Sequence, residues 1–216
     1  MKTFISLVMV GIFLLPASAQ ESGPASGLLV TVRPKEERIH FLMTLGGAYM
    51  EEGDTDSAVS VYERVLELEP EEFEIYGVIS AVYISAHKYA EAEKILLEQI
   101  ETDPDAFRPK NNLAWLYATA TDPAFRDGHK AIQLAQEAIV SEPYSHHVWS
   151  TLAEAYYVTG DYEKAYRAIR HMAALAIQQN ISITKEAVDN YNAQIRKCKR
   201  ALDIQKMMSG EEVEEL

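Results

Sequence analysis

The chain has 216 residues, with 20 Lys and Arg against 33 Asp and Glu, which gives a formal net charge of −13. It is 48% hydrophobic, with ten glycines and eight prolines, so it is too apolar for a disordered chain and too poor in glycine for a collagen-like one. The strong acidity argues against binding to nucleic acid, which requires Lys and Arg to replace counterions along the phosphates. The single cysteine, Cys198, excludes an intramolecular disulfide framework and a zinc site built from cysteines.

Residues 1–19 have the pattern of a secretory signal peptide. Lys2 supplies a positive start, Phe4 to Leu15 form an apolar run, and small residues at 17–19 precede the expected cleavage point. The apolar run is about a dozen residues, short of the roughly 20 that a membrane-spanning helix needs. We therefore expect no stable membrane insertion after cleavage, and a mature protein that is periplasmic or secreted, from a Gram-negative-type bacterium. A signal peptide retained as an anchor is the alternative.

A period of 34 residues organises the middle of the chain. Tyr49 and Tyr83 are 34 residues apart, as are Pro70 and Pro104, and each proline is expected to end the second helix of its unit. The next step, from Pro104 to Pro143, is 39 residues, so the third unit carries five extra residues, placed in the turn between its two helices. The four units cover residues 39–72, 73–106, 107–145 and 146–179.

The spacing within the units resembles the tetratricopeptide repeat (TPR) family. The first unit reads Leu42-x2-Leu45-Gly46-x2-Tyr49 and then Gly53-Asp54; the fourth reads Trp149-x2-Leu152-Ala153-x2-Tyr156 and then Gly160-Asp161. Arg126-Asp127-Gly128 in the third unit is similar to an expanded-loop variant of bacterial members. The resemblance implies an all-α fold, an α-solenoid of four helix-turn-helix units plus a C-terminal capping helix, because stacking the pairs buries a continuous core.

The residue types in the turns fit this pairing of helices. Gly53 and Gly160 suit the left-handed position that closes a first helix, and Asp54 and Asp161 can cap the helix that follows. A small residue such as Gly46 lets the paired helices approach closely.

The segments on either side of the repeats, which span residues 37–179, differ in composition. Residues 20–36 contain Ser-Gly-Pro-Ala-Ser-Gly and lack helical periodicity, so we expect a flexible leader. Apolar residues then recur every three or four positions after the repeats, which predicts a capping helix in segment 180–208, at about 184–207. Residues 209–216 form an acidic tail that should fray.

Cys198 lies on the apolar stripe of the predicted capping helix, which favours a packing role. Its basic neighbours at 196–200 would lower the pKa of its thiol, so an intermolecular disulfide is the alternative.

The sequence has no recognisable catalytic or metal-binding motif. The zincin H-E-x-x-H pattern, the G-x-S-x-G elbow and the phosphate-binding glycine loops are absent. His146 and His147 are adjacent, so on a helix they point about 100° apart and do not easily share one metal ion. Glu154 follows His147 by seven residues, on nearly the same face, which permits a polar contact between them. We expect no enzyme activity, no metal and no cofactor.

In the TPR family, four positions of each first helix face a concave groove, so the resemblance implies that these positions bind a protein or peptide. The groove candidates are His40, Met43, Met50, Glu74, Arg108, Asn111, Trp115, His147, Ser150, Glu154 and Tyr157. Several are of the types that dominate binding hot spots. For Trp115, packing in the core is an equally open alternative.

These patterns predict a non-catalytic, exported TPR scaffold or adaptor that binds a protein or peptide segment in its concave groove. Acidic residues crowd the first two repeats, from Glu51 to Asp105, which favours a basic partner. Two alternatives stay open. One is a structural self-assembly module, in which the capping helix docks on another copy to form a homo-oligomer; the other is a glycan-binding or enzyme-associated accessory module of the cell envelope.

Overall fold

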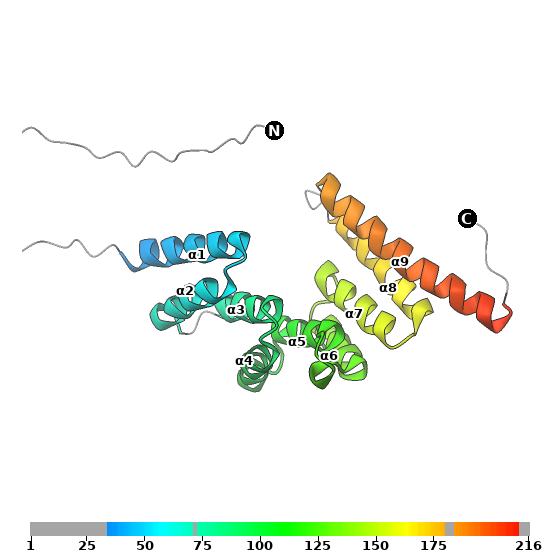
Figure 1. Ribbon diagram of the computed structural model, residues 1–216, viewed down its shortest axis with the longest axis horizontal. Helices are drawn as coiled ribbons and strands as arrows, with labels where there is room; N and C mark the ends of the chain where they lie inside the picture. The colour runs from blue at the N-terminus through cyan, green and yellow to red at the C-terminus, as the bar shows by residue number, and fades with distance from the viewer. Residues whose placement is uncertain (1–33, 71–72, 180–183, 212–216) are drawn as a thin grey trace, which may run out of the picture. The chain divides into compact units, whose positions relative to one another are not determined.

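The computed structural model describes residues 34–70, 73–179 and 184–211, and its regular structure there is entirely helical. The helices are α1 Lys35–Glu52, α2 Thr55–Leu68, α3 Phe73–Ser85, α4 Tyr89–Thr102, α5 Phe107–Thr119, α6 Gly128–Ser141, α7 His146–Val158, α8 Tyr162–Gln178 and α9 Lys185–Ser209 (Figure 1). The predicted all-α class is confirmed. The expected signal peptide, residues 20–33 of the leader and residues 212–216 of the tail lie outside the described residues. Within the described ranges, no helix combines the length and apolar character that crossing a bilayer requires.

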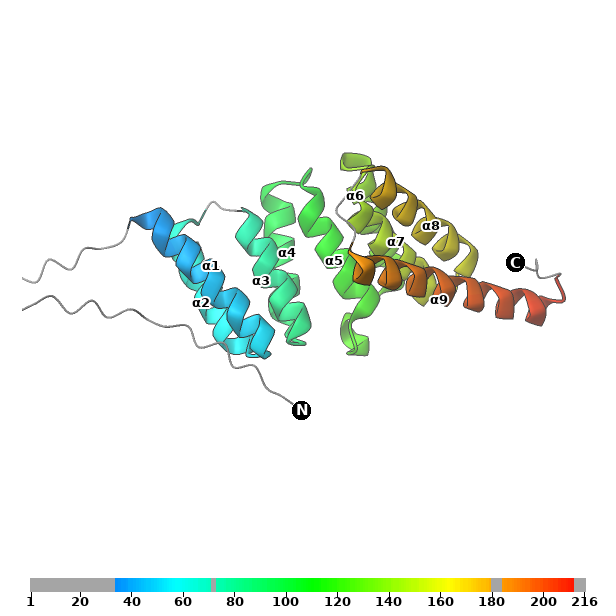
Figure 2. The ribbon, with the colours of Figure 1, turned by 90° about the horizontal axis from the view of Figure 1, so that it is seen from above.

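The helices pack as four successive pairs, followed by α9. Within the pairs, α1 contacts α2, α3 contacts α4, α5 contacts α6 and α7 contacts α8, while α9 packs on α8 (Figures 1 and 2). The first helices also meet one another, because α3 contacts α5 and α5 contacts α7. Side chains from several repeats can therefore share one face. This is the predicted stacking of helix-turn-helix units with a helix that covers the last pair.

The turns inside the pairs use the predicted chemistry. Gly53 and Gly160 have φ of 78° and 83°, the left-handed region that favours glycine. Asp54 and Asp161 each accept a hydrogen bond from a backbone N–H three residues on, which caps α2 and α8. The second pair departs from this rule: His87 takes the left-handed position, with φ of 59°.

The five extra residues of the third unit lie in the turn between α5 and α6, as predicted. They include a short 3₁₀ helix, Pro123–Phe125. The Arg126 side chain donates to the backbone oxygen of Ala120 across 2.8 Å, and Asp127 caps α6. The ring of Phe125 packs against that of Tyr89 with centroids 5.7 Å apart. The longer turn is thus tied to the second pair through Phe125, although most of its residues are exposed.

The core is built from small residues facing large ones. Gly46 lies so close to Tyr62 that a Cβ at Gly46 would be 2.5 Å from the ring atom Cζ. The second helices contribute alanines at matching positions, all fully buried: Ala58, Ala92, Ala131 and Ala165. The large side chains of Ile79 and Leu96 are also fully buried. Close helix approach at these points is what allows the pairs to stack.

The last helix, α9, runs from Lys185 to Ser209, two residues further than expected. Cys198 lies on its buried stripe and is 4% exposed, so the packing role is confirmed. The expectation of a lowered thiol pKa is wrong. Burial raises the pKa of Cys198 to about 11 and outweighs the opposing effect of Lys197, because the thiolate is poorly solvated there.

Candidate functional site

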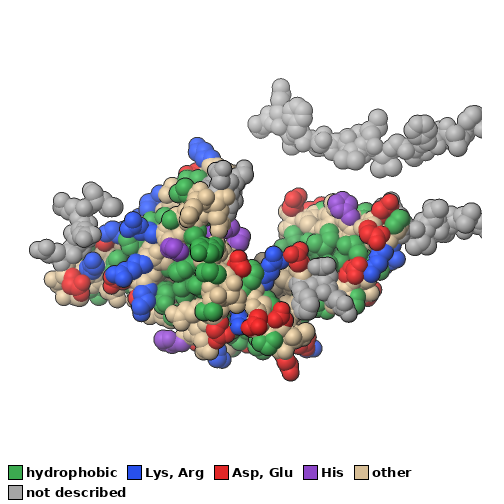
Figure 3. Space-filling view, turned by 180° about the vertical axis from the view of Figure 1, so that it is seen from behind, with side chains coloured by type: hydrophobic (Ala, Val, Ile, Leu, Met, Phe, Trp, Pro, Cys, Tyr) green, Lys and Arg blue, Asp and Glu red, His purple; other side chains and the backbone are tan. Residues whose placement is uncertain are grey.

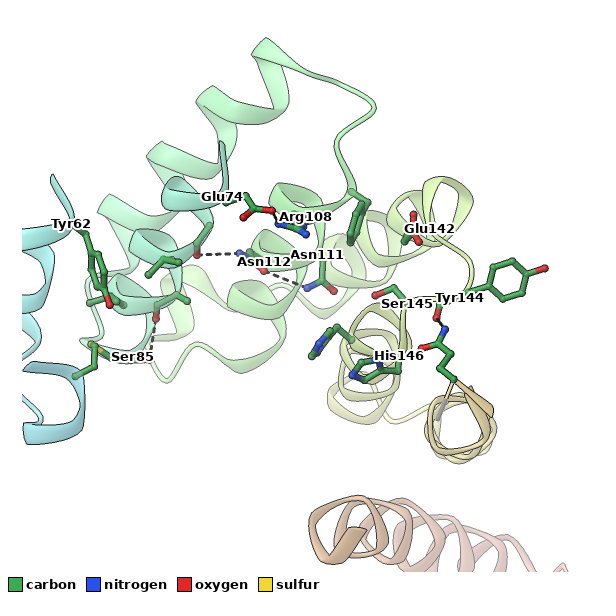
Figure 4. Close-up of a pocket in the computed structure, with 18 residues that line it drawn as sticks. Tyr62, Glu74, Ser85, Arg108, Asn111, Asn112, Glu142, Tyr144, Ser145 and His146 are labelled. Atoms are coloured by element: carbon green, nitrogen blue, oxygen red, sulfur yellow. Dashed lines mark hydrogen bonds and ion pairs between the residues drawn. The ribbon is translucent and has the colours of Figure 1, made fainter. Parts of the chain in front are cut away.

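A cavity of about 940 Å³ lies along the face shared by the first helices of successive repeats. It is lined by Met50, Tyr62, Glu74, Gly77, Val78, Ala81, Val82, Ser85, Phe107, Arg108, Asn111, Asn112, Glu142, Tyr144, Ser145, His146, His147 and Gln179 (Figure 4). The lining residues come from all four repeats, so no single pair of helices forms this site. We call it the groove cavity.

Two amides on α5 form the centre of the groove cavity (Figure 4). Asn112 donates to the backbone oxygen of Gly77 on α3 at 3.5 Å and to Ser80 Oγ at 3.3 Å, which fixes its side chain. Asn111 donates to Asn112 Oδ1 at 3.3 Å. The Oδ1 atom of Asn111 is buried, and no donor of the described residues reaches it. A buried acceptor without a partner costs about 1–3 kcal/mol, which a donor from a bound ligand would offset.

One edge of the groove cavity carries an ion pair between repeats. Arg108 on α5 donates from Nη1 to Oε1 of Glu74 on α3 across 2.8 Å. Both side chains are more than half exposed, so the pair contributes little to stability, about 0–1 kcal/mol. Its main effect is on charge, because Arg108 neutralises a carboxylate that would otherwise face a ligand.

The end of the groove cavity nearest α7 is formed by the turn before that helix and by its first two residues, His146 and His147. The rings of His146 and His147 lie with centroids 3.9 Å apart. Burial, together with the neighbouring charge of His147, lowers the pKa of His146 below its usual 6.5. Gln179, just after α8, donates to the backbone oxygen of Tyr144 across 2.6 Å and so fixes the turn in place.

Five of the eleven predicted groove residues meet in this cavity. They are Met50, Glu74, Arg108, Asn111 and His147. The structure therefore brings together the predicted residues of the middle of the groove. The remaining six lie elsewhere.

Two predicted residues of the fourth repeat contact the capping helix instead. Lys197 of α9 donates from Nζ to both carboxylate oxygens of Glu154 at 2.8 Å, and the same Nζ lies 3.9 Å from the ring centroid of Tyr157. The spacing permitted a polar contact between Glu154 and His147, but in the structure the partner of Glu154 is Lys197. This pairing occurs because α9 packs beside the fourth pair and brings a cation to that face.

The other four predicted residues also lie outside the groove cavity. Trp115 is 39% exposed, which rules out the alternative that it is a core residue, yet it does not line the cavity. Met43 packs on the core cluster of the first repeats, His40 is exposed on α1, and Ser150 is half-buried on α7.

Several lining residues were missed from the sequence. Asn112 belongs to the cavity because α3 approaches α5 closely enough for a side chain between the usual groove positions to reach Gly77. Tyr144 and Gln179 lie in or after turns, and their contact spans 35 residues. The sequence signal for Asn112 was its position directly beside the predicted groove residue Asn111.

The chemistry that the cavity offers is hydrogen bonding and apolar contact. In the described part of the chain, no group of three or more His, Cys, Asp or Glu side chains is placed to hold a metal ion. The lining supplies amides, four hydroxyls, two carboxylates, two imidazoles and one paired arginine beside aliphatic surface such as Val78. These groups suit the backbone and side chains of an extended peptide.

Known proteins resemble this chain in both sequence and structure. Residues 49–116 match the family model of the tetratricopeptide repeat. Superkiller protein 3 of Schizosaccharomyces pombe is 24% identical over 134 residues, which are 61% of this chain and 10% of that protein. The chain thus spans about a tenth of the length of this curated relative.

Solved structures share the fold at low sequence identity. A thermophilic TPR protein of Thermus thermophilus matches with a TM-score of 0.55 and 16% identity, over 80% of this chain and 97% of that chain. A mutant O-GlcNAc transferase of Thermobaculum terrenum matches with a TM-score of 0.51 and 17% identity, over 66% of this chain and 27% of that chain. The described helices thus share the fold of a tetratricopeptide-repeat protein, and residues 49–116 match the model of that family, as the spacing predicted.

Proposed function

We propose that the protein is an exported, non-catalytic adaptor that holds an extended segment of another protein in the groove cavity. The tetratricopeptide fold suggests a scaffold for protein–protein interaction. The observation that carries the proposal is the side chain of Asn111, which lines the cavity. Its buried Oδ1 atom has no hydrogen-bond partner among the described residues. Because this oxygen is buried in the free protein, a backbone N–H of a bound segment would supply the missing donor once the Asn111 side chain turns toward the cavity.

The dimensions and lining of the groove cavity favour an extended peptide over a compact small molecule. Its residues run from Met50 on α1 to Gln179 after α8, so a ligand that fills it contacts all four repeats. An extended chain presents a backbone donor or acceptor with every residue, about 3.3 Å apart. Such spacing can meet Asn111 and reach polar groups of the turn at Ser145 in one pose.

The charges around the groove cavity favour a segment with positive charge. Glu142 lines the cavity and forms no ion pair with a described residue, whereas Arg108 is already paired with Glu74. The acidic surface of the first two repeats would further attract a basic partner. Export rests on the signal-peptide pattern of residues 1–19, and mass measurement of the protein from a periplasmic fraction would show whether those residues are removed.

Selection of peptides on the immobilised protein tests the proposed function. Peptides enriched on the parent should bind N111A/H147A about tenfold or more weakly, because both side chains line the cavity. Q133A is the matched control, since Gln133 is an exposed polar residue of α6 outside the cavity, and it should change affinity less than about twofold. Equal loss in both variants, or no loss in N111A/H147A, would exclude the groove cavity as the binding site.

A further inference from the structure

A second cavity, of about 560 Å³, lies between α8 and the end of α9. Its charged lining residues are Glu163, Arg167, Arg170 and Lys206. Arg167 donates to Glu163 across 2.5 Å, so these two charges cancel. Within the described ranges, neither Arg170 nor Lys206 forms an ion pair; Arg170 lies over the ring of Tyr166 at 5.6 Å. The cavity therefore keeps two uncompensated positive charges in a protein whose net charge is −13.

The surroundings extend this positive character. Figure 3 shows Lys and Arg side chains gathered over the part of the surface formed by α8 and α9. A neighbouring cavity of about 530 Å³ shares Arg167 and His171 with it and has an apolar floor that includes Trp149 and Leu152. The ring of Trp149 packs edge-on against His171 with centroids 4.2 Å apart. A ligand with carboxylates and a few apolar side chains would match both cavities.

The chain itself carries such a segment directly after α9. Gly210 has φ of 78°, and the backbone N–H of Glu211 donates to the oxygen of Lys206 across 3.0 Å, which closes the helix with a left-handed turn. This turn redirects the chain beside Lys206, a residue that lines the cavity. The sequence then continues as Glu-Glu-Val-Glu-Glu-Leu through residues 211–216, of which 212–216 lie outside the described residues.

We propose that the acidic segment 211–216 binds in the cavity between α8 and α9 of its own chain. Its carboxylates would lie against Arg170 and Lys206, and Val213 would face the apolar floor of the neighbouring cavity. The segment is long enough, because five residues beyond Glu211 span up to about 17 Å, whereas α8 rises about 12 Å from Glu163 to His171. A tether this short also gives an effective concentration in the millimolar range, so weak contacts suffice.

A fluorescence experiment on the full chain tests this proposal. Trp115→Phe leaves Trp149 as the single tryptophan, and Leu216→Cys accepts a nitroxide label that quenches tryptophan at short range. Cys198 is buried and should stay unlabelled, which mass measurement of the labelled protein verifies. We expect quenching of Trp149 by about half at low salt and its near loss at 0.5 M salt, where screening leaves a Debye length of about 4 Å.

Charge variants then locate the contact. R170E/K206E should remove most of the quenching. R196E/R200E is the control, because it changes the net charge by the same amount on exposed residues of α9 outside the cavity, and it should retain the quenching. Combining R170E/K206E with E212K/E214K/E215K should restore quenching, which also shows that the variant is folded. Three results would overturn the proposal. The parent could show no quenching, or both charge variants could lose it equally. Quenching could also rise with protein concentration, which would assign the segment to another copy.

Discussion

The ring of Tyr62 on α2 occupies the space in which a side chain on Gly46 of α1 would have to lie. A Cβ at this position would be 2.5 Å from Tyr62 Cζ, closer than any relaxed contact allows. The neighbouring Gly47 is different, because a Cβ there meets nothing within 4 Å. The two adjacent glycines of α1 therefore serve different purposes: Gly46 allows the first pair of helices to close, and Gly47 is free to change.

Alanine substitutions at these two glycines should change stability in opposite directions. Gly46→Ala should lower the free energy of unfolding by about 1–3 kcal/mol, because the buried Tyr62 ring must shift. Gly47→Ala should raise it by about 0.5–1 kcal/mol, since alanine is the better helix former. Urea unfolding of both variants measures this. A shift of the same sign and size in both would show that Tyr62 does not restrict Gly46.

The buried hydroxyl of Tyr83 makes stability sensitive to alkaline pH. Burial, and then its hydrogen bond to Glu63 Oε1 at 3.0 Å, raise the pKa of Tyr83 from 10.0 to about 12. The pKa of Tyr83 is higher in the folded protein than in the unfolded chain. The stability that the protonated hydroxyl contributes is therefore fully present below pH 10 and is lost as the pH rises towards 12. Unfolding free energies should fall by roughly 1 kcal/mol from pH 10 to 11 on account of this group.

Tyr83→Phe provides the check on that pH dependence. It removes the titrating hydroxyl, so the fall in stability above pH 10 should become shallower. Part of the fall should remain, because the pKa of Tyr117 is also raised. At pH 8 the variant should lose about 1 kcal/mol through the missing hydrogen bond to Glu63. An unchanged alkaline profile would mean that Tyr83 does not titrate with unfolding.

The thiol of Cys198 should be unreactive in the folded protein. It is 4% exposed, and burial raises its pKa to about 11, so the reactive thiolate is scarce at neutral pH. A coloured thiol reagent at pH 8 should label less than about a tenth of the protein in the time that labels it fully in urea. Rapid labelling of folded protein, or a disulfide-linked dimer on a non-reducing gel, would contradict this packing.

Acid should destabilise the start of α7 at His146. The pKa of His146 is lowered from 6.5 by burial and by the nearby His147, so the unfolded chain binds this proton more readily than the folded one. The stability that depends on neutral His146 is fully present above pH 6.5. It is lost as the pH falls from 6.5 through the lower pKa that His146 has in the folded protein. His146→Gln should flatten the pH dependence of the unfolding midpoint between pH 7 and 5. His129→Gln, on an exposed residue of α6, is the control and should leave it unchanged.

Features set by neighbours in the sequence could be predicted well. The 34-residue period, the glycine at 53 with its capping Asp54, and the placement of the extra residues before α6 all depend on short-range backbone preferences. The turns and caps follow from residue types within a few positions of one another, and the period follows from the recurrence of these local patterns along the chain. The structure contains all of them.

Features set by packing between distant segments were harder to predict. Glu154 was expected in the groove, but Lys197, 43 residues later, takes it as a partner. The pKa of Cys198 was expected to fall because the charges beside it in sequence were visible, whereas the burial that raises it depends on how α9 packs on α8. Asn112 was missed because its role depends on the approach of α3 and α5.

The measurement that tests the groove cavity most directly is a two-dimensional NMR titration with a peptide selected on the parent protein. The side-chain amide signals of Asn111 and Asn112 should shift on binding, because both groups line the cavity and Asn111 Oδ1 gains a donor. The side-chain signal of Gln133 on α6 should stay in place. Peptide binding with unmoved Asn111 and Asn112 signals would contradict the assignment of the groove cavity as the binding site.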